Sequence, residues 1–125
     1  MRLMLTPFKM GLGGRLGDGT QWTSWIHIDD VVSLICHAIE NTSLRGPVNA
    51  TAPNPVRNSQ FTETLARVLR RPAFFPVPAW GLKLMFGEMA EVMLASHRVL
   101  PRNAENAAFK FSFPDLGPAL KNLLA

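Results

Sequence analysis

The stretch GLGGRLGDGTQWTSWIHIDD, residues 11–30, decides how this sequence is interpreted. Five glycines fall within residues 11–19, and the alternation of bulky and small residues that follows predicts a strand over Trp22 to Ile28. A dinucleotide fingerprint has a different order, with a strand before the glycines and a helix directly after them. The stretch also lacks the Lys-Ser or Lys-Thr pair of a P-loop. It therefore predicts a hairpin or a mobile loop in place of a phosphate cradle.

A helix is expected directly after this strand, running to about Asn41. Asp29 or Asp30 is expected to cap it, because a carboxylate there accepts the free amide protons of the first turn. The adjacency of these two residues at a helix start favours capping over a catalytic carboxylate pair. Five apolar residues share one face of this amphipathic helix, with His37 on the opposite side. The five are Val31, Leu34, Ile35, Ala38 and Ile39.

The rest of the chain reads as further helices and short strands. A helix capped by Asn58 or Ser59 ends at Arg71-Pro72 and turns Phe61, Leu65, Val68 and Leu69 inward. A helical region over 79–96, bent near Gly87, carries apolar residues in nearly every direction and must be covered on more than one side. A last helix follows Asp115 and holds Pro118 in its first turn. Residues 48–51 and 109–113 are expected to be strands, and 73–78 to be extended.

Length and composition predict a single mixed α and β domain over residues 1–125. Of these residues, 47% are hydrophobic and 18% are charged, which is typical of a globular protein and not of a disordered one. The net charge is +4, but the basic residues are scattered, so the charge pattern does not indicate nucleic-acid binding. The fold class is therefore α/β, with amphipathic helices and a few short strands.

Several kinds of chemistry are excluded by the residues that the chain lacks. Cys36 is its single cysteine, and His27, His37 and His97 show no metal-binding spacing, so no disulfide within the chain and no metal site are expected. No apolar run approaches the ~20 residues of a membrane span, and no leader is recognised at the start. We expect a cytoplasmic protein, with an organelle also open. The chain has no tyrosine, so a mechanism with a tyrosine acid or base is excluded for this chain alone.

Three phrases of the sequence resemble the later half of a known family. They are GDGTQWTSWIHIDDVVSLICHAIEN, GPVNATAPNPVRNSQFTETLARVLRRP and FFPVPAWGLKLMFGEMAEVMLAS, in this order. They resemble the extended short-chain dehydrogenase/reductase proteins, in the subgroup of NAD(P)-dependent, nucleotide-sugar-epimerase-like proteins. The region from RPAFFPVPAW onward is similar to the C-terminal domain of unknown function of that subgroup. The resemblance implies the C-terminal, substrate-side lobe of a Rossmann-type protein.

Two motifs of that family are missing from this sequence. The family binds its dinucleotide with a glycine fingerprint near the N-terminus and transfers protons with a Tyr-x-x-x-Lys pair, and neither is present. The resemblance therefore implies that NAD(P) is held by an N-terminal domain that this chain lacks. No catalytic, cofactor-binding or metal-binding residue is assigned to this chain.

The resemblance does suggest residues on the substrate side, because it implies that the loop Gly13 to Trp25 and the start of the helix at Asp30 lie nearest the reacting groups. Trp22 and Trp25 could stack on a ring or wall a pocket, or could be core residues of a strand. His27 could contact substrate, but a structural histidine with satisfied hydrogen bonds is favoured, since nothing near it in sequence forms an acid–base pair. Arg57 and Arg98 follow loops and could bind a substrate phosphate, with a surface role as the default.

Two functions from different classes remain open at this point. The chain could be the substrate-side portion of an NAD(P)-dependent epimerase or reductase-like protein, without activity alone, with a nucleotide-sugar-like molecule as the substrate of the longer protein. Alternatively, it could be a non-enzymatic interaction or dimerisation module. The second function rests on the apolar segment Trp80 to Phe86, which would be uncovered without the missing domain and could form a homodimer.

Overall fold

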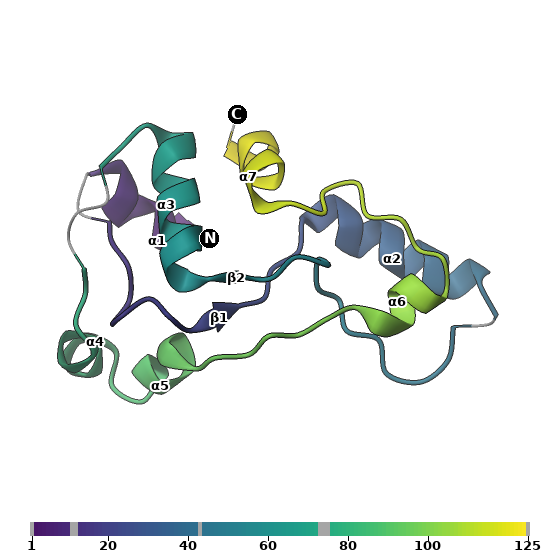
Figure 1. Cartoon of the computed structure of the whole chain (residues 1–125), viewed down its shortest axis with the longest axis horizontal. Coiled ribbons are helices and arrows are strands. Elements are labelled where there is room, and N and C mark those ends of the chain that lie inside the picture. The colour runs from purple at the N-terminus through teal and green to yellow at the C-terminus, as the bar shows by residue number, and fades with distance from the viewer. Residues whose placement is uncertain (1, 11–12, 43, 73–75, 125) are drawn as a thin grey trace.

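The computed structural model describes residues 2–10, 13–42, 44–72 and 76–124. The molecule is elongated: α1, α3 and α7 gather at one end, α2 and α6 lie at the other, and extended segments run between them (Figure 1). The helices are α1 (Arg2–Lys9), α2 (Ile28–Glu40), α3 (Asn58–Leu69), α4 (Ala79–Phe86), α5 (Met89–Leu94), α6 (Arg102–Asn106) and α7 (Leu116–Leu124). The strands are β1 (Trp22–Thr23) and β2 (Val56–Arg57). The predicted mixture of helices and short strands is confirmed.

The hydrophobic core lies where α1, α3 and α7 meet. Its buried members are Phe8, Leu65, Leu116 and Leu120. Partly buried residues pack around them: Leu5, Trp25, Val56, Phe61, Val68, Leu69 and Leu124. All four residues predicted to face inward from α3 belong to this cluster, so the predicted face of that helix is confirmed.

The sheet is smaller than the sequence predicts. β1 pairs with β2 in antiparallel fashion, with Trp22 opposite Arg57 and Thr23 opposite Val56. The strand predicted to reach Ile28 ends at Thr23, and residues 48–51 and 109–113 are not strands, so these three predictions were wrong. A strand needs a hydrogen-bonded neighbour along its length, and here the Ala52 N–H donates to the Trp25 carbonyl (2.7 Å) without a ladder around it.

His27, and not Asp29 or Asp30, caps the N-terminus of α2. Its backbone is extended (φ −75°, ψ 143°), and its Nδ1 accepts the Asp29 N–H at 3.0 Å. The helix begins two or three residues earlier than a cap at Asp29 or Asp30 predicts, so both aspartates lie inside the first turn, where their charge still suits the helix dipole. The buried carboxylate of Asp30 accepts the N–H groups of Ser112 (2.8 Å) and Phe113 (3.0 Å).

The face of α2 that contacts the rest of the chain is the more polar one. His37, predicted to lie opposite the apolar face, donates its Nε2–H to the Ala107 carbonyl at 2.8 Å and meets Phe109 edge to face. Leu34 is buried, but four aliphatic residues one or two turns apart are 55–78% exposed. We call these four the α2 stripe: Ile28, Val32, Ile35 and Ile39.

The start of α3 also differs from the prediction. Its cap position is Arg57, whose N–H donates to the Gln60 side chain at 3.0 Å. Asn58, a predicted cap, instead accepts the Leu16 N–H at 2.8 Å through its side-chain oxygen. The cap prediction was wrong because Asn58 ties the preceding glycine loop to α3.

Tight turns, and no hairpin, occupy the described part of the glycine-rich stretch. Gly17 and Gly19 have φ of 61° and 71°, a left-handed conformation that favours glycine. The Gly17 N–H donates to the Val77 carbonyl (2.7 Å), and the Ser59 N–H donates to the Gly19 carbonyl (3.0 Å). Residues 11–12, at the start of the stretch, lie outside the described part of the chain.

In the C-terminal half, the predicted bend near Gly87 and the predicted place of Pro118 in the first turn of the last helix are confirmed. Gly87, with φ of 59°, separates α4 from α5, and Pro118 is the third residue of α7. The short helix α6 was not predicted, and residues 73–75 of the stretch expected to be extended lie outside the described part of the chain. Within the described ranges, no helix is long and apolar enough to cross a membrane.

Candidate functional site

Trp22 and Arg57 lie side by side because they are opposite partners in the antiparallel pair of strands. Residues directly opposite each other in such a pair project to the same face. The Arg57 guanidinium lies over the Trp22 ring, 4.9 Å from its centroid, which is the geometry of a cation–π contact. The same side chain donates from Nη1 to the Thr20 carbonyl at 3.0 Å, which fixes its direction.

Arg98 reaches the same indole ring from a segment far away in the sequence. Its guanidinium lies 5.2 Å from the Trp22 centroid. The segment after α5 runs beside β1 (Figure 1), where the Trp22 N–H donates to the Ser96 hydroxyl at 3.0 Å. Ser24 binds the next residues of the same segment. The Ser24 hydroxyl donates to the His97 carbonyl (2.8 Å) and accepts the Val99 N–H (3.1 Å).

The resulting group, which we call the Trp22 cluster, consists of Trp22, Arg57 and Arg98. Among the described residues, neither guanidinium has a carboxylate within ion-pair distance. Two positive charges thus approach one ring without a negative partner. Their mutual repulsion would fall if an anion bound between or beside them, and guanidinium groups bind phosphate and carboxylate oxygens in a planar, two-pronged way.

Asp18, in the loop before the cluster, is already engaged. Its carboxylate accepts the Thr20 N–H (3.0 Å) and the Thr20 hydroxyl (2.8 Å). The Thr20 N–H and then its hydroxyl hold the pKa of Asp18 below its usual range, with a smaller contribution from Arg15. The carboxylate of Asp18 is therefore ionised, and its hydrogen bonds with Thr20 stabilise the turn.

The other two substrate-side candidates have internal partners. Trp25 packs against the core cluster and donates its Nε1–H to the Asn54 carbonyl at 3.0 Å. His27 is 1% exposed, contacts Asn122 Oδ1 through Nε2 at 2.9 Å, and stacks on Phe113 with centroids 4.0 Å apart. The structural interpretation favoured for His27 agrees with these bonds. A substrate contact by Trp25 or His27 stays a prediction.

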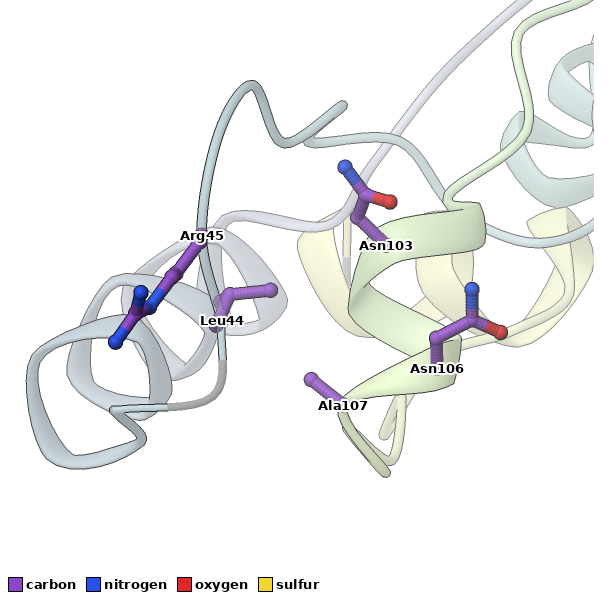
Figure 2. Close-up of a pocket in the computed structure, with 5 residues that line it drawn as sticks. All are labelled: Leu44, Arg45, Asn103, Asn106 and Ala107. Carbon is purple, nitrogen blue, oxygen red and sulfur yellow. The ribbon is translucent and has the colours of Figure 1, made fainter.

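A separate hollow of about 200 Å³ lies between α6 and the loop after α2. Its lining residues are Leu44, Arg45, Asn103, Asn106 and Ala107 (Figure 2). The Arg45 side chain points away from the two asparagines in this view, and Asn103 donates to the Pro47 carbonyl. The charged groups of the chain do not converge here, so the Trp22 cluster is the stronger candidate. In the part of the chain that the structure describes, no three metal-ligating side chains lie together.

Sequence reasoning missed the residues that assemble the cluster. Ser24 and Ser96 lie 72 positions apart and join two extended segments through their hydroxyls. No spacing or periodicity marks such serines. The two-residue strands leave no such signal either, and the prediction placed Arg57 directly after a loop, with no strand there.

The C-terminal part of the chain matches a known domain. Residues 77–123 match the family described as Domain of unknown function (DUF1731). This match confirms the resemblance drawn from the sequence for the region after Pro72. It covers α4 to α7 and includes Arg98.

Relatives extend the match to nearly the whole chain. Over 123 residues, the chain is 45% identical to the epimerase family protein YfhF of Bacillus subtilis (strain 168), covering 98% of this chain and 41% of the relative. A crystal structure of human epimerase family protein SDR39U1 (isoform 2) with NADPH superposes with a TM-score of 0.92 at 39% identity, over 98% of this chain and 42% of that one. A nucleoside-diphosphate sugar epimerase from Corynebacterium glutamicum gives a TM-score of 0.65 at 37% identity, over 94% of this chain and 22% of that one. The chain thus spans about two fifths of YfhF and of the human structure.

Proposed function

We propose that this chain, which matches the C-terminal part of epimerase family proteins in sequence and fold, supplies the substrate side of an NAD(P)-dependent epimerase-like protein. The observation that carries the proposal is the Trp22 cluster, with two guanidiniums 4.9 and 5.2 Å from one ring centroid. We assign this cluster to the anionic portion of the substrate.

The chemistry of the cluster suits a diphosphate. Arg57 and Arg98 come from different segments, so two phosphoryl groups, or two oxygens of one group, can each meet a guanidinium. The Trp22 ring adds a flat apolar surface beside the charges, which a nucleobase or sugar ring can cover. One similar protein is described as a nucleoside-diphosphate sugar epimerase, and the proposed ligand class agrees with that description.

The cofactor and the proton-transfer groups would come from another part of the longer protein. The amide groups of the glycine turns are already used, since Gly17 N–H donates to Val77 and Gly19 N–H donates to Leu16. These two amides are therefore not free to bind a dinucleotide phosphate. The sequence also offers no tyrosine for proton transfer. Bound NAD(P) would exchange a hydride with the substrate, while this chain orients the anionic end; alone it is expected to be inactive.

The α2 stripe is the surface that we expect the cofactor-binding part to cover. Four aliphatic side chains lie exposed along one side of the helix. The extended segments 24–27 and 47–52 carry few backbone hydrogen bonds to other described residues. In a protein that joins this chain to a cofactor-binding part, amide hydrogen exchange should slow at Val32 and Ile35 relative to the chain alone. Unchanged exchange at both positions would contradict this arrangement.

Ligand titration tests the role of the Trp22 cluster. Uridine diphosphate and inorganic pyrophosphate are titrated into the chain and followed by tryptophan fluorescence and by NMR of the indole N–H groups. We expect perturbation of Trp22 and affinities that fall with added salt. Arg57→Gln and Arg98→Gln should each weaken binding about 10- to 100-fold, the scale of a lost charged hydrogen bond.

Arg67→Gln is the matched control, because Arg67 is an exposed arginine on α3 outside the cluster. Equal affinity of all three variants would show that binding reflects the overall positive charge and would remove the proposal. Added NADPH should leave the melting temperature of the chain unchanged. A clear rise would mean that the chain holds the cofactor itself.

A further inference from the structure

The segment between α5 and α6 carries Arg98 to the Trp22 cluster, and we call its residues 96–100 the Arg98 strap. It runs in extended form beside β1 (Figure 1). Within the described ranges, one backbone-to-backbone hydrogen bond joins it to β1, from the His97 N–H to the Trp22 carbonyl at 3.4 Å. Its other hydrogen bonds involve the side chains of Ser24, Asn49, Thr51 and Ser96. Side chains, more than a strand ladder, therefore hold Arg98 beside the ring.

The Ser24 hydroxyl makes two of these contacts, one on each side of Arg98. It donates to the His97 carbonyl at 2.8 Å and accepts the Val99 N–H at 3.1 Å. The two side-chain bonds further along the strap are 3.5 Å long, which is beyond the usual hydrogen-bond distance. A hydroxyl can donate one bond and accept others, so a single side chain fixes the backbone before and after Arg98.

Arg57 reaches the same ring without the strap. It is placed by the pairing of β2 with β1, and its Nη1–H donates to the Thr20 carbonyl at 3.0 Å. Among the described residues, the Arg98 guanidinium contacts the Trp22 ring and has no hydrogen bond or carboxylate of its own. Its position therefore follows from the backbone that carries it. Because the two guanidiniums have like charge, the attachment of the strap must hold Arg98 against their repulsion.

We propose that Ser24 is the positioning residue of the Trp22 cluster: its hydroxyl sets Arg98 beside the ring, and an anion bound at Arg98 in turn stabilises the attached strap. The ligand class rests on the proposed function, whereas the placement of Arg98 rests on the hydrogen bonds of Ser24. With the strap attached, the cluster presents two guanidiniums, and with the strap released only Arg57 remains. A ligand that prefers the attached strap must also favour attachment, since coupling between two equilibria is reciprocal.

NMR of the arginine side chains tests the placement of Arg98 without any ligand. Protons that lie over an indole face are shifted by its ring current, so the Arg98 Hδ and Hε signals report the distance to the ring. Ser24→Ala should move them towards the values of an unstructured peptide and leave the Arg57 signals unchanged. Ser24→Thr keeps the hydroxyl and should retain the Arg98 signals. Ser96→Ala removes one bond before Arg98 but leaves both Ser24 bonds, so its effect should be smaller.

Titration with inorganic pyrophosphate tests whether Ser24 acts through Arg98. Ser24→Ala should weaken binding about 10-fold in the otherwise unchanged chain, the scale of a lost charged hydrogen bond. In the Arg98→Gln chain the same change should weaken binding by less than about 2-fold, because the group that Ser24 positions is gone. Saturating pyrophosphate should slow amide exchange of the Val99 N–H about 10-fold or more in the unchanged chain and in Ser24→Thr.

Each outcome bears on a separate part of the proposal. Arg98 signals that stay in place in Ser24→Ala, or Arg57 signals that move equally, would overturn the positioning role. Equal weakening by Ser24→Ala with and without Arg98→Gln would overturn it too. Unchanged exchange at Val99 with pyrophosphate bound would contradict the coupling between ligand and strap. If the chain binds no pyrophosphate while Ser24→Ala still displaces Arg98, the proposed function and the coupling fail, and the placement of Arg98 by Ser24 stands.

Discussion

Helices α3 and α2 are of nearly equal length, 12 and 13 residues, and both have apolar residues at helical spacing. In α3 that face is covered: Leu65 is fully buried between α1 and α7. In α2 much of the corresponding face is open, with Ile39 78% exposed. The sequence pattern of a helix thus predicts which residues share a face, whereas the neighbouring elements determine whether that face is buried.

The two helices also differ in how they attach to the molecule. α3 is held by apolar packing, whereas α2 is held through polar groups: the carboxylate of Asp30, the ring of His37 and the cap at His27. Hydrogen bonds to fixed groups hold a helix in one orientation without using its apolar face. The α2 stripe therefore stays available to another surface while the helix remains attached.

The largest expected contrast is between Leu65→Ala and Ile39→Ala. Leu65→Ala should lower the free energy of unfolding by about 3–5 kcal/mol, because it leaves a cavity at a fully buried position of the core. Ile39→Ala should change it by no more than about 0.5 kcal/mol, since that side chain contacts water in this chain. Urea unfolding followed by circular dichroism measures both. Equal losses would show that the α2 stripe is buried and would break the comparison.

Asp30→Ala tests the polar attachment of α2. Removing the carboxylate leaves the N–H groups of Ser112 and Phe113 without their acceptor, at an expected cost of about 2–3 kcal/mol in the free energy of unfolding. Asp29→Ala is the control, because the Asp29 side chain is 68% exposed. The same urea experiment compares them. If the two variants unfold at the same urea concentration, polar attachment does not hold α2 in place.

His27→Phe should lower the free energy of unfolding by a smaller amount, about 1–2 kcal/mol, the usual effect of losing a helix cap. A phenyl ring keeps the stack on Phe113 and loses both hydrogen bonds, to the Asp29 N–H and to Asn122. Amide exchange should rise in the first turn of α2 and in α7 together. His97→Phe, at an exposed position, is the control. Faster exchange in only one of the two helices would show that the ring does not link them.

The smallest effect is expected at Asp18, outside both helices. The Thr20 N–H and hydroxyl favour its carboxylate form and lower its pKa, so the stabilisation is present above the pKa of the unfolded chain and is lost as the pH falls through the folded value. NMR titration should give a lower midpoint for Asp18 than an unstructured peptide of residues 15–21. Asp18→Asn should leave the attachment of α2 and α3 unchanged. An equal midpoint in the chain and in the peptide would show that the folded turn does not lower the pKa of Asp18.

Helix periodicity allowed much of the fold to be predicted. The inward face of α3, the break at Gly87 and the start of α7 before Pro118 all follow from local rules, and the structure confirms them. The strands at 48–51 and 109–113 failed because strand formation needs a partner elsewhere in space. The caps failed for a related reason, since Asn58 and Asp30 bond to distant backbone groups in preference to their own helices.

The residues of the candidate site could be predicted from the sequence, but their arrangement could not. Trp22, Arg57 and Arg98 were each suggested by the family resemblance, and the structure brings these three together. Their convergence could not be predicted, because it depends on the short pairing of β1 with β2 and on the hydroxyls of Ser24 and Ser96. Single serines and two-residue strands leave no periodic signal in a sequence.

The bond between His27 and Asn122 spans 95 positions of the chain, and this separation sets an order for assembly during protein synthesis. At a rate of about 5–20 residues per second, His27 waits roughly 5–20 seconds before the ribosome has added Asn122. Throughout that interval, the ring at the start of α2 lacks one of its two hydrogen bonds. Helix α2 is thus among the last parts of the chain to form all of its hydrogen bonds. A partner that covers the α2 stripe could bind before the bond between His27 and Asn122 forms.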